Sequence, residues 1–526
     1  MGMLLGSLLG HPQTRRAVGS VFRQWSQRRI ERLDRMNAGE LQRRILARLV
    51  RKARSTRFGQ DHGFSRIRSI ADYQSAVPLR RYEDFWRDYW QPTFPHSFDA
   101  TWPDAVRYVA LSSGTTTGKT KYIPLTDEIL KSHQRGALTS LARLQTFDPQ
   151  FTPFSGKMFF LGGSTGLESV GNGPLMGDLS GVVNREAKDW VRPFTFPSPE
   201  LSLLNDWDVK LDRLAAASIN QPITLVSGVP SWLLVLFDRV RQLTGRDTLR
   251  EVWPTLQVVV HGGTSFEPYR RLFRKVIGDD SVRLIETYPA SEGFIASDDP
   301  RYEMLRLIPD NDIFFEFVPS QELFSARPTR HTIDQVEPGI NYGVVLTTTA
   351  GLWSYILGDT VTFESSERLL LRFSGRVDHF LSAFGEHVIG EEVDRSIERA
   401  ALVTDAAVAD FHVGPVFPSS TEKVGFHRYY IEFVREPESL DRFRDVLDQH
   451  LSAINDDYRA HRLGDLTMGP PEVLTLPRGT FADWMKSRGK LGGQNKVPRL
   501  DNTGRIGEQL GNWMETVADH DLSRFG

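Results

Sequence analysis

Apolar residues recur along the chain with two different periods, and the change of period predicts the fold. Near Val18–Arg54 they recur every three or four residues, which is typical of helices. From Lys157 on, short apolar runs alternate with helical segments, a pattern typical of a mainly parallel sheet flanked by helices. The expected strands are Met158–Leu161, Ile223–Val226, Leu256–Val260 and Val282–Ile285, and the expected helices include Ser231–Leu243 and Pro268–Val276.

The second half of the chain has a different pattern. Ile313–Val318 and Tyr342–Phe363 are β-rich, and after about Ser374 short strands surround an amphipathic helix at Ser439–Ile454. We therefore expect an α/β protein with two domains. Residues 1–374 are expected to form a large N-terminal domain of mainly parallel sheets flanked by helices, plus a β-rich part. Residues 375–526 are expected to form a small, mobile C-terminal α+β domain.

Composition narrows the class of protein. The chain has 526 residues, a formal net charge of -2 and no cysteine. Such a charge gives no reason to expect binding to nucleic acid or to a membrane surface, and no apolar run approaches the ~20 residues of a membrane helix. The lack of cysteine excludes disulfides, thiolate metal sites and a covalent enzyme thioester. We expect a cytoplasmic protein, and we expect the many aromatic residues between Phe58 and Pro95 to lie in the core.

A polar stretch between two short apolar runs contains the residue types that bind phosphate. Ser112–Lys121 reads Ser-Ser-Gly-Thr-Thr-Thr-Gly-Lys-Thr-Lys and follows an expected strand at Val106–Leu111. Its glycines allow a tight turn that brings backbone N–H groups close to an anion, and its hydroxyls and lysines add donors and positive charge. The glycine spacing differs from that of the mononucleotide P-loop, and a strand instead of a helix is expected to follow. A polar hairpin without a ligand is the alternative, and a helix with Thr126 as its N-cap is expected next.

Two polar clusters follow expected strands, where ligands of open α/β sheets bind. His261–Thr264 contains Gly262 and Gly263, which allow a flat ring or a phosphate to approach the backbone. Thr287–Glu292 follows the strand Val282–Ile285 and offers an aromatic face for a base and a carboxylate for a cation such as Mg2+. A buried tyrosine and a solvated glutamate are the alternative explanation of this second cluster.

Two further motifs carry single candidate residues. Trp353–Asp359 alternates like a strand, and its Gly-Asp pair taken alone predicts a hairpin turn. In a nucleotide site, the Asp359 carboxylate would accept hydrogen bonds from ribose hydroxyls, and Arg376 would reach the sugar or a phosphate. Lys496 lies in a glycine-rich turn near the C-terminus, where a solvated lysine is the alternative.

In this order, the motifs resemble the signature motifs of the adenylate-forming superfamily. More narrowly, they resemble the auxin-responsive acyl-acid amido synthetases, the Gretchen Hagen family, and their bacterial relatives. Each motif alone is a weak signal, whereas four in the right order are a strong one. The similarity covers nearly the whole chain from about Leu41. This sequence has Ile356 where many relatives have arginine, and Asn495 where relatives often have an aromatic residue. The four motifs are Ser112–Lys121, Tyr288–Glu292, Tyr355–Asp359 and Gln494–Arg499.

The resemblance implies a role for each candidate residue. Tyr288 would stack on adenine, Asp359 would hold the ribose, and Arg376 would support the nucleotide. Glu292, Lys121 and Lys496 would be catalytic: Glu292 as a ligand of Mg2+, and Lys496 by neutralising charge at the carboxylate and the α-phosphate. The residues expected to contact the phosphates of ATP are Ser112, Ser113, Gly114, Thr115, Thr116, Thr117 and Lys121, and those expected to line the rest of the nucleotide site are Gly262, Gly263 and Thr287.

The implied reaction has two halves. A carboxylic acid attacks the α-phosphorus of ATP, which gives an acyl-adenylate and pyrophosphate. An amine, expected to be an amino acid, then attacks the acyl-adenylate and gives an amide and AMP. One alternative is transfer of the acyl group to coenzyme A or a carrier-protein thiol, and another is a catalytically silent nucleotide-binding scaffold.

Overall fold

The structure is a computed structural model. It describes residues 12–96, 99–113, 120–162, 166–169, 173–187, 190–202, 204, 207–262, 266, 269–376, 380–381, 383–384, 386, 388–417, 424–462, 468–488 and 497–522. The chain divides into two compact units. The large unit comprises Met1–Thr264 and Lys275–Arg372, and the small unit comprises Ser265–Arg274 and Phe373–Gly526.

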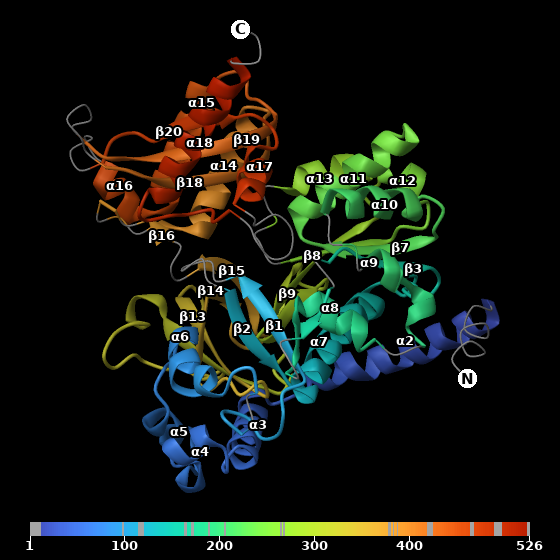
Figure 1. Cartoon of the computed structure of the whole chain (residues 1–526), viewed down its shortest axis with the longest axis vertical. Helices are drawn as coiled ribbons and strands as arrows, with labels where there is room; N and C mark the ends of the chain where they lie inside the picture. The colour runs from blue at the N-terminus through green and yellow to red at the C-terminus, as the bar shows by residue number, and fades with distance from the viewer. Residues whose placement is uncertain are drawn as a thin grey trace. The chain divides into compact units, whose positions relative to one another are not determined.

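One mixed sheet of eleven strands organises the large unit, with the order β12-β13-β14-β15-β11-β10-β9-β8-β7-β3-β6 (Figure 1). Neighbours from β9 to β6 are parallel, whereas β9, β10 and β11 pair antiparallel, as do β12, β13 and β14. The strands of the parallel half are β3 (Lys157–Phe160), β6 (Thr195–Phe196), β7 (Ile223–Gly228), β8 (Val258–Gly262) and β9 (Arg283–Ala290). Those of the other half are β10 (Gly293–Asp299), β11 (Met304–Leu307), β12 (Ile313–Pro319), β13 (Asn341–Thr348), β14 (Tyr355–Ser365) and β15 (Leu370–Arg376).

The predicted α/β class is confirmed, and so are the four predicted strands of the parallel half. They read as continuous apolar runs because parallel strands are covered on both faces, and the first four residues of β7 are all buried. The β-rich part predicted at Tyr342–Phe363 is two strands of the same sheet, β13 and β14. The helices that alternate with these strands include α8 (Leu179–Arg185), α9 (Pro199–Ser202), α10 (Trp207–Ser218), α11 (Pro230–Thr244) and α12 (Leu249–Val252). Helix α13 (Arg270–Ile277) belongs partly to each unit.

A second, smaller sheet contains the predicted phosphate-binding hairpin. Its order is β2-β1-β5-β4, and β1 pairs antiparallel with β2. A strand precedes and follows the polar stretch as predicted, and α7 (Asp127–Phe147) then begins at the predicted N-cap Thr126, whose side chain accepts from the Ile129 N–H. The strands are β1 (Tyr108–Ser113), β2 (Thr120–Leu125), β4 (Glu168–Ser169) and β5 (Leu175–Gly177).

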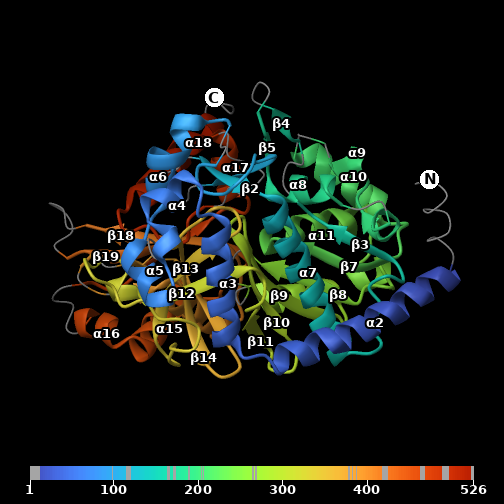
Figure 2. The same cartoon turned by 90° about the horizontal axis from the view of Figure 1, so that it is seen from below.

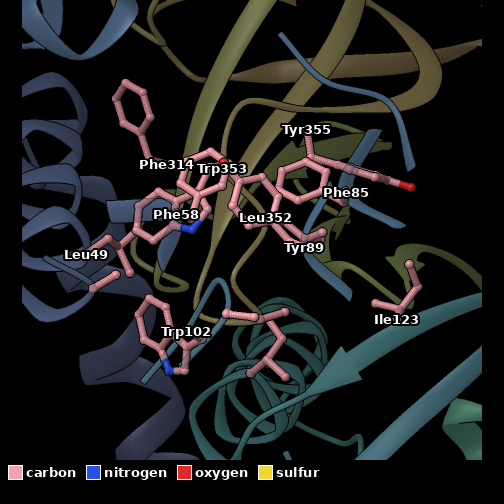
Figure 3. Packing of buried hydrophobic residues seen from close by; sticks show 14 of the residues in the cluster. Leu49, Phe58, Phe85, Tyr89, Trp102, Ile123, Phe314, Leu352, Trp353 and Tyr355 are labelled. Carbon is pink, nitrogen blue, oxygen red and sulfur yellow. The ribbon is translucent and has the colours of Figure 1, made fainter. Parts of the chain in front are cut away.

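An aromatic cluster fills the space between the N-terminal helices and β14 (Figure 3). Phe58 and Trp353 stack with ring centroids 6.0 Å apart, and Phe85 lies against Tyr355. The predicted core role of the aromatics between Phe58 and Pro95 holds for most of them, since all the Phe, Tyr and Trp rings there except Trp86 and Phe94 are buried. The helices of this region are α2 (Pro12–Asp34), α3 (Ala38–Lys52), α4 (Arg57–Asp61), α5 (Ile70–Ala76), α6 (Tyr82–Phe85) and a π-helix at Trp86–Trp90.

Helix α7 lies along β10, and α2 lies along α7 (Figure 2). The close approach of α7 depends on Gly136, because a Cβ at this position would lie 2.4 Å from Cγ of Phe294. We expect Gly136→Ala to destabilise the large unit by about 1–3 kcal/mol, since a packed core has no room for an added methyl group. Gly19→Ala in α2 is the matched control, because nothing lies within 4 Å of the added Cβ. Urea denaturation followed by circular dichroism would measure both, and equal stability of the two variants would contradict this packing.

The small unit is an α+β structure, as predicted. Its three-stranded sheet has the order β18-β19-β20, with β18 and β19 antiparallel and β19 and β20 parallel. Helices α14 and α15 contribute Ile397 and Leu447 to the core against Ile431 of β19. The elements are β16 (Phe380–Leu381), β17 (Val388–Ile389), α14 (Gly390–Val403), β18 (Ala407–Val416), β19 (Phe426–Arg435), α15 (Leu440–Ile454), α16 (Asp456–Arg462), β20 (Glu472–Leu476), α17 (Thr480–Ser487) and α18 (Arg505–Leu522).

Candidate functional site

Glu292 lies in the turn between β9 and β10 and is only 5% exposed. The Tyr355 hydroxyl donates a hydrogen bond of 2.9 Å to Glu292 Oε1. The predicted end of the strand near Ile285 is wrong, since β9 continues to Ala290 and pairs with β10. The alternative of a solvated glutamate is wrong as well. Glu292 is a buried carboxylate with one of its oxygens held by a tyrosine.

A second carboxylate–tyrosine pair joins β9 to β14. Tyr288 donates its hydroxyl to Asp359 Oδ2 at 2.8 Å, and both side chains are 6% exposed. The hairpin turn predicted from Gly358 and Asp359 taken alone is wrong, because both residues lie inside β14. Gly358 has φ of 91°, which a glycine adopts without strain, and the β13–β14 register shifts beside it. This irregularity looked like a turn in the sequence.

Strands β8 and β9 meet at the predicted glycine cluster. Gly262 pairs with Thr287, and the Thr287 hydroxyl donates to the His261 carbonyl at 3.2 Å. A Cβ on Gly262 would lie 2.2 Å from the Thr287 carbonyl oxygen, so no other residue fits here without a shift of the backbone. Gly263 lies outside the described residues.

The two ends of the predicted phosphate-binding stretch lie on the paired strands β1 and β2. Ser112 of β1 faces Lys121 of β2, and Ser113 faces Thr120 in the next pair. Lys121 is half-buried, and its Nζ lies 5.8 Å from the centroid of the Tyr82 ring. The residues that connect these strands, Gly114, Thr115, Thr116 and Thr117 among them, lie outside the described residues.

The segment from Arg80 into helix α6 connects this hairpin to β14. The Arg80 backbone exchanges hydrogen bonds with Ser354 and Ile356 on either side of Tyr355. At the other side, the Tyr82 hydroxyl accepts from the Tyr122 N–H at 2.9 Å. The sequence did not single out this connection. The only sign of it was the density of aromatic residues, which was interpreted correctly as core.

The small unit contains the two remaining candidates. Arg376 is the last residue of β15, and Lys496 lies outside the described residues. The chain is anchored shortly after Lys496: His412 donates to the Pro498 carbonyl at 2.6 Å, and the Val413 N–H donates to the Arg499 carbonyl at 2.8 Å. Burial lowers the pKa of His412 to about 4, so this anchor carries no charge near pH 7. Arg499 is fixed in turn by Asp394, 2.7 Å away.

The buried carboxylate of Glu292 is suited to hold a magnesium ion that is bound together with phosphates. Mg2+ is usually held by one or two carboxylates with phosphate and water oxygens, and a buried glutamate with one oxygen already bonded is consistent with that arrangement. In the described part of the chain, no group of three or more histidine or acidic residues is arranged to hold a metal ion.

Among the described residues, no helix combines the length and apolar character needed to cross a bilayer.

Comparison with known families matches most of the chain to one of them. The GH3 family N-terminal domain matches residues 27–172 and 169–282, the central domain residues 306–376, and the C-terminal domain residues 391–505. The three domains follow one another in the order of the family. Their boundaries enclose the candidate residues except Thr287, Tyr288 and Glu292, which lie between the N-terminal and central matches.

Two rice proteins and one solved structure illustrate the similarity. The chain is 31% identical over 295 residues to a probable indole-3-acetic acid-amido synthetase, GH3.9, of Oryza sativa subsp. japonica, covering 50% of this chain and 64% of that protein. It is 24% identical to the jasmonoyl–L-amino acid synthetase GH3.5 of the same organism over 89% of this chain and 93% of that protein. The structure of the GH3.15 acyl acid amido synthetase superposes with a TM-score of 0.75 at 18% identity, covering 92% of this chain and 95% of that one.

The fold is that of the adenylate-forming superfamily, whose motifs the sequence resembles in the same order. Within that superfamily, the chain belongs to the GH3 family, the Gretchen Hagen family that its motifs resemble.

Proposed function

We propose that this protein is an ATP-dependent acyl-acid amido synthetase. It joins a small carboxylic acid to an amine, through an acyl-adenylate, and releases pyrophosphate and AMP. The observation that carries the proposal is the pair of buried carboxylate–tyrosine contacts, Glu292 with Tyr355 and Asp359 with Tyr288. These contacts join two of the four signature motifs within one sheet. The names of the rice relatives support an amide product.

Each candidate site residue of the large unit has a role in the first half-reaction. Asp359 accepts hydrogen bonds from the ribose hydroxyls, with its other oxygen already fixed by Tyr288. Ser112, Lys121 and the residues between them hold the β- and γ-phosphates, so that the α-phosphorus faces the incoming acid. Glu292 holds Mg2+, which when bound supplies charge neutralisation on the phosphate oxygens. The chain contributes positioning and electrostatic stabilisation, which are the main requirements of transfer at phosphorus.

The remaining roles belong to residues of the small unit. Arg376 supports the nucleotide, and Lys496 neutralises the charge that develops between the carboxylate and the α-phosphate. In the second half-reaction an amine, with its nitrogen lone pair free, attacks the acyl carbonyl, the bond to the adenylate oxygen breaks, and AMP leaves. Since the chain has no cysteine, no thioester to the enzyme itself intervenes.

A screen of carboxylic acids tests the proposal. The protein is incubated with ATP, Mg2+ and single acids, including indole-3-acetate and jasmonate, and pyrophosphate release is measured. Acids that respond are then offered a mixture of amino acids or coenzyme A in separate reactions, and the products are identified by mass spectrometry. We expect amides and AMP with amino acids. A thioester with coenzyme A and no amide would favour the thiol alternative, and no AMP with any acid would support a silent scaffold.

A further inference from the structure

The side chain of Tyr355 contacts Glu292 and orients its carboxylate. Tyr355 is fully buried, and its donor lies 2.9 Å from Oε1 of the carboxylate. With Oε1 bonded in this way, the carboxylate is held in one rotamer.

The residue before Tyr355 has an unusual backbone. Ser354 has φ of 45°, a left-handed conformation that costs a residue with a Cβ about 1–2 kcal/mol. Its side chain is fully buried and lies within hydrogen-bond distance of three partners: Tyr73 Oη at 3.0 Å, Glu316 Oε2 at 3.0 Å and Arg330 Nη2 at 2.6 Å. Its backbone N–H also donates to Thr347 Oγ1 at 2.9 Å.

Two of these partners, Glu316 and Arg330, form a buried ion pair. Glu316 of β12 is 0% exposed and lies 2.8 Å from the Arg330 guanidinium, which also donates to the backbone carbonyls of Gln74 and Val77. A buried ion pair is costly to desolvate and adds little net stability compared with apolar packing. Its placement around the hydroxyl of one strained serine therefore calls for another explanation, and backbone strain of this kind is concentrated at functional sites.

We infer that Tyr355 is a positioning residue for the metal-binding carboxylate Glu292, and that the Glu316–Arg330 pair keeps Tyr355 aimed by locking Ser354 in its left-handed conformation. The inference rests on the proposed function, because it assigns Glu292 to a divalent cation bound with ATP. Contacts connect every step: Glu316 to the Ser354 hydroxyl, Ser354 to the next residue along the chain, and Tyr355 to Glu292. The Arg80 backbone holds the residues on either side of Tyr355 in place.

Calorimetric titration of Tyr355→Phe tests the first step without relying on turnover. We expect the affinity for ATP in the presence of Mg2+ to fall about tenfold, the typical loss for a hydrogen bond to a charged group, and the affinity for ATP in EDTA to stay within about twofold of wild type. Tyr342→Phe is the matched control, since Tyr342 is equally buried on the neighbouring strand and its hydroxyl accepts from the Glu337 N–H instead. We expect this control to bind both forms of ATP like wild type.

The outcomes separate this inference from the proposed function. If the wild-type protein binds ATP with Mg2+ and Tyr355→Phe binds it equally well, the positioning role is wrong while the proposed function stands. If the wild-type protein binds no ATP under either condition, the proposed function itself fails. An equal loss of affinity with and without Mg2+ would also overturn the inference, because it would show a general defect of the nucleotide site.

Two substitutions of Ser354 test the second step. Both Ser354→Gly and Ser354→Ala remove the hydroxyl, but only glycine adopts positive φ without strain. If the ion pair acts by holding the backbone, alanine weakens binding of ATP with Mg2+ several-fold more than glycine does, and melting curves verify that both variants fold. Equal affinities of the two variants would contradict the role of the backbone conformation.

Discussion

Lys496→Ala lowers the rate of acid-dependent ATP–pyrophosphate exchange by about a hundredfold or more, if the proposed role of this lysine is correct. Negative charge accumulates between the attacking carboxylate and the α-phosphate, and the loss of a single positioned donor in a transition state typically costs this much. Binding of ATP should change far less than the rate, because the lysine acts mainly on charge that develops during the reaction. Rapid-quench measurement of the exchange at saturating ATP and acid gives the rate directly.

Lys486→Ala is the control for Lys496. Lys486 is an exposed lysine of α17 in the same unit, so its removal causes the same change in net charge without altering the motif Gln494–Arg499. We expect this variant to exchange at the wild-type rate. An exchange rate of Lys496→Ala near wild type would show that the glycine-rich turn contains an ordinary solvated lysine.

Asp359→Ala weakens binding of ATP by roughly 1–3 kcal/mol through the lost charge-assisted hydrogen bonds to the ribose. It also leaves the buried Tyr288 hydroxyl without its acceptor, so the variant should melt at a lower temperature than wild type. Asp359→Asn keeps an acceptor for Tyr288 but removes the charge. Titration calorimetry and melting curves on both variants measure the two effects separately.

Tyr288→Phe completes this comparison. It removes the hydroxyl but retains the ring that is proposed to stack on adenine, and it leaves the Asp359 carboxylate in place. We therefore expect Tyr288→Phe to bind ATP more tightly than Asp359→Ala does. Unchanged ATP affinity in both aspartate variants would show that Asp359 has a structural role in β14 and no contact with the nucleotide.

Much of the fold follows from local patterns in the sequence. The parallel strands were predictable because burial on both faces leaves continuous apolar runs such as Ile223–Val226. Helix α7 was predictable because Thr126 caps it through its own side chain. The family was predictable because four motifs occur in a fixed order, and this prediction is confirmed. The division at residue 374 and the roles of the individual site residues stay predictions.

The wrong predictions share a physical cause, which is that pairing with a neighbouring strand overrides local turn signals. Thr287 to Ala290 resembles a loop after a strand, yet pairing with β10 keeps it extended. Gly358 resembles a turn, yet β13 accommodates it as an irregularity within a strand. The contact between Tyr355 and Glu292 joins residues 63 positions apart, and no pattern within either motif specifies it. Likewise, nothing in the sequence indicates that Ser265–Arg274 groups with the small unit.

The most direct test of the central claim follows an oxygen atom. If the acid attacks the α-phosphorus of ATP, a carboxylate labelled with 18O at both oxygens transfers one labelled oxygen to AMP when the amide forms. Mass spectrometry of the AMP from a single turnover with an amino acid should show one 18O per molecule, and pyrophosphate should contain none. Label in inorganic phosphate with ADP as the nucleotide product, or amide formation without label in AMP, would contradict an acyl-adenylate and the account built on it.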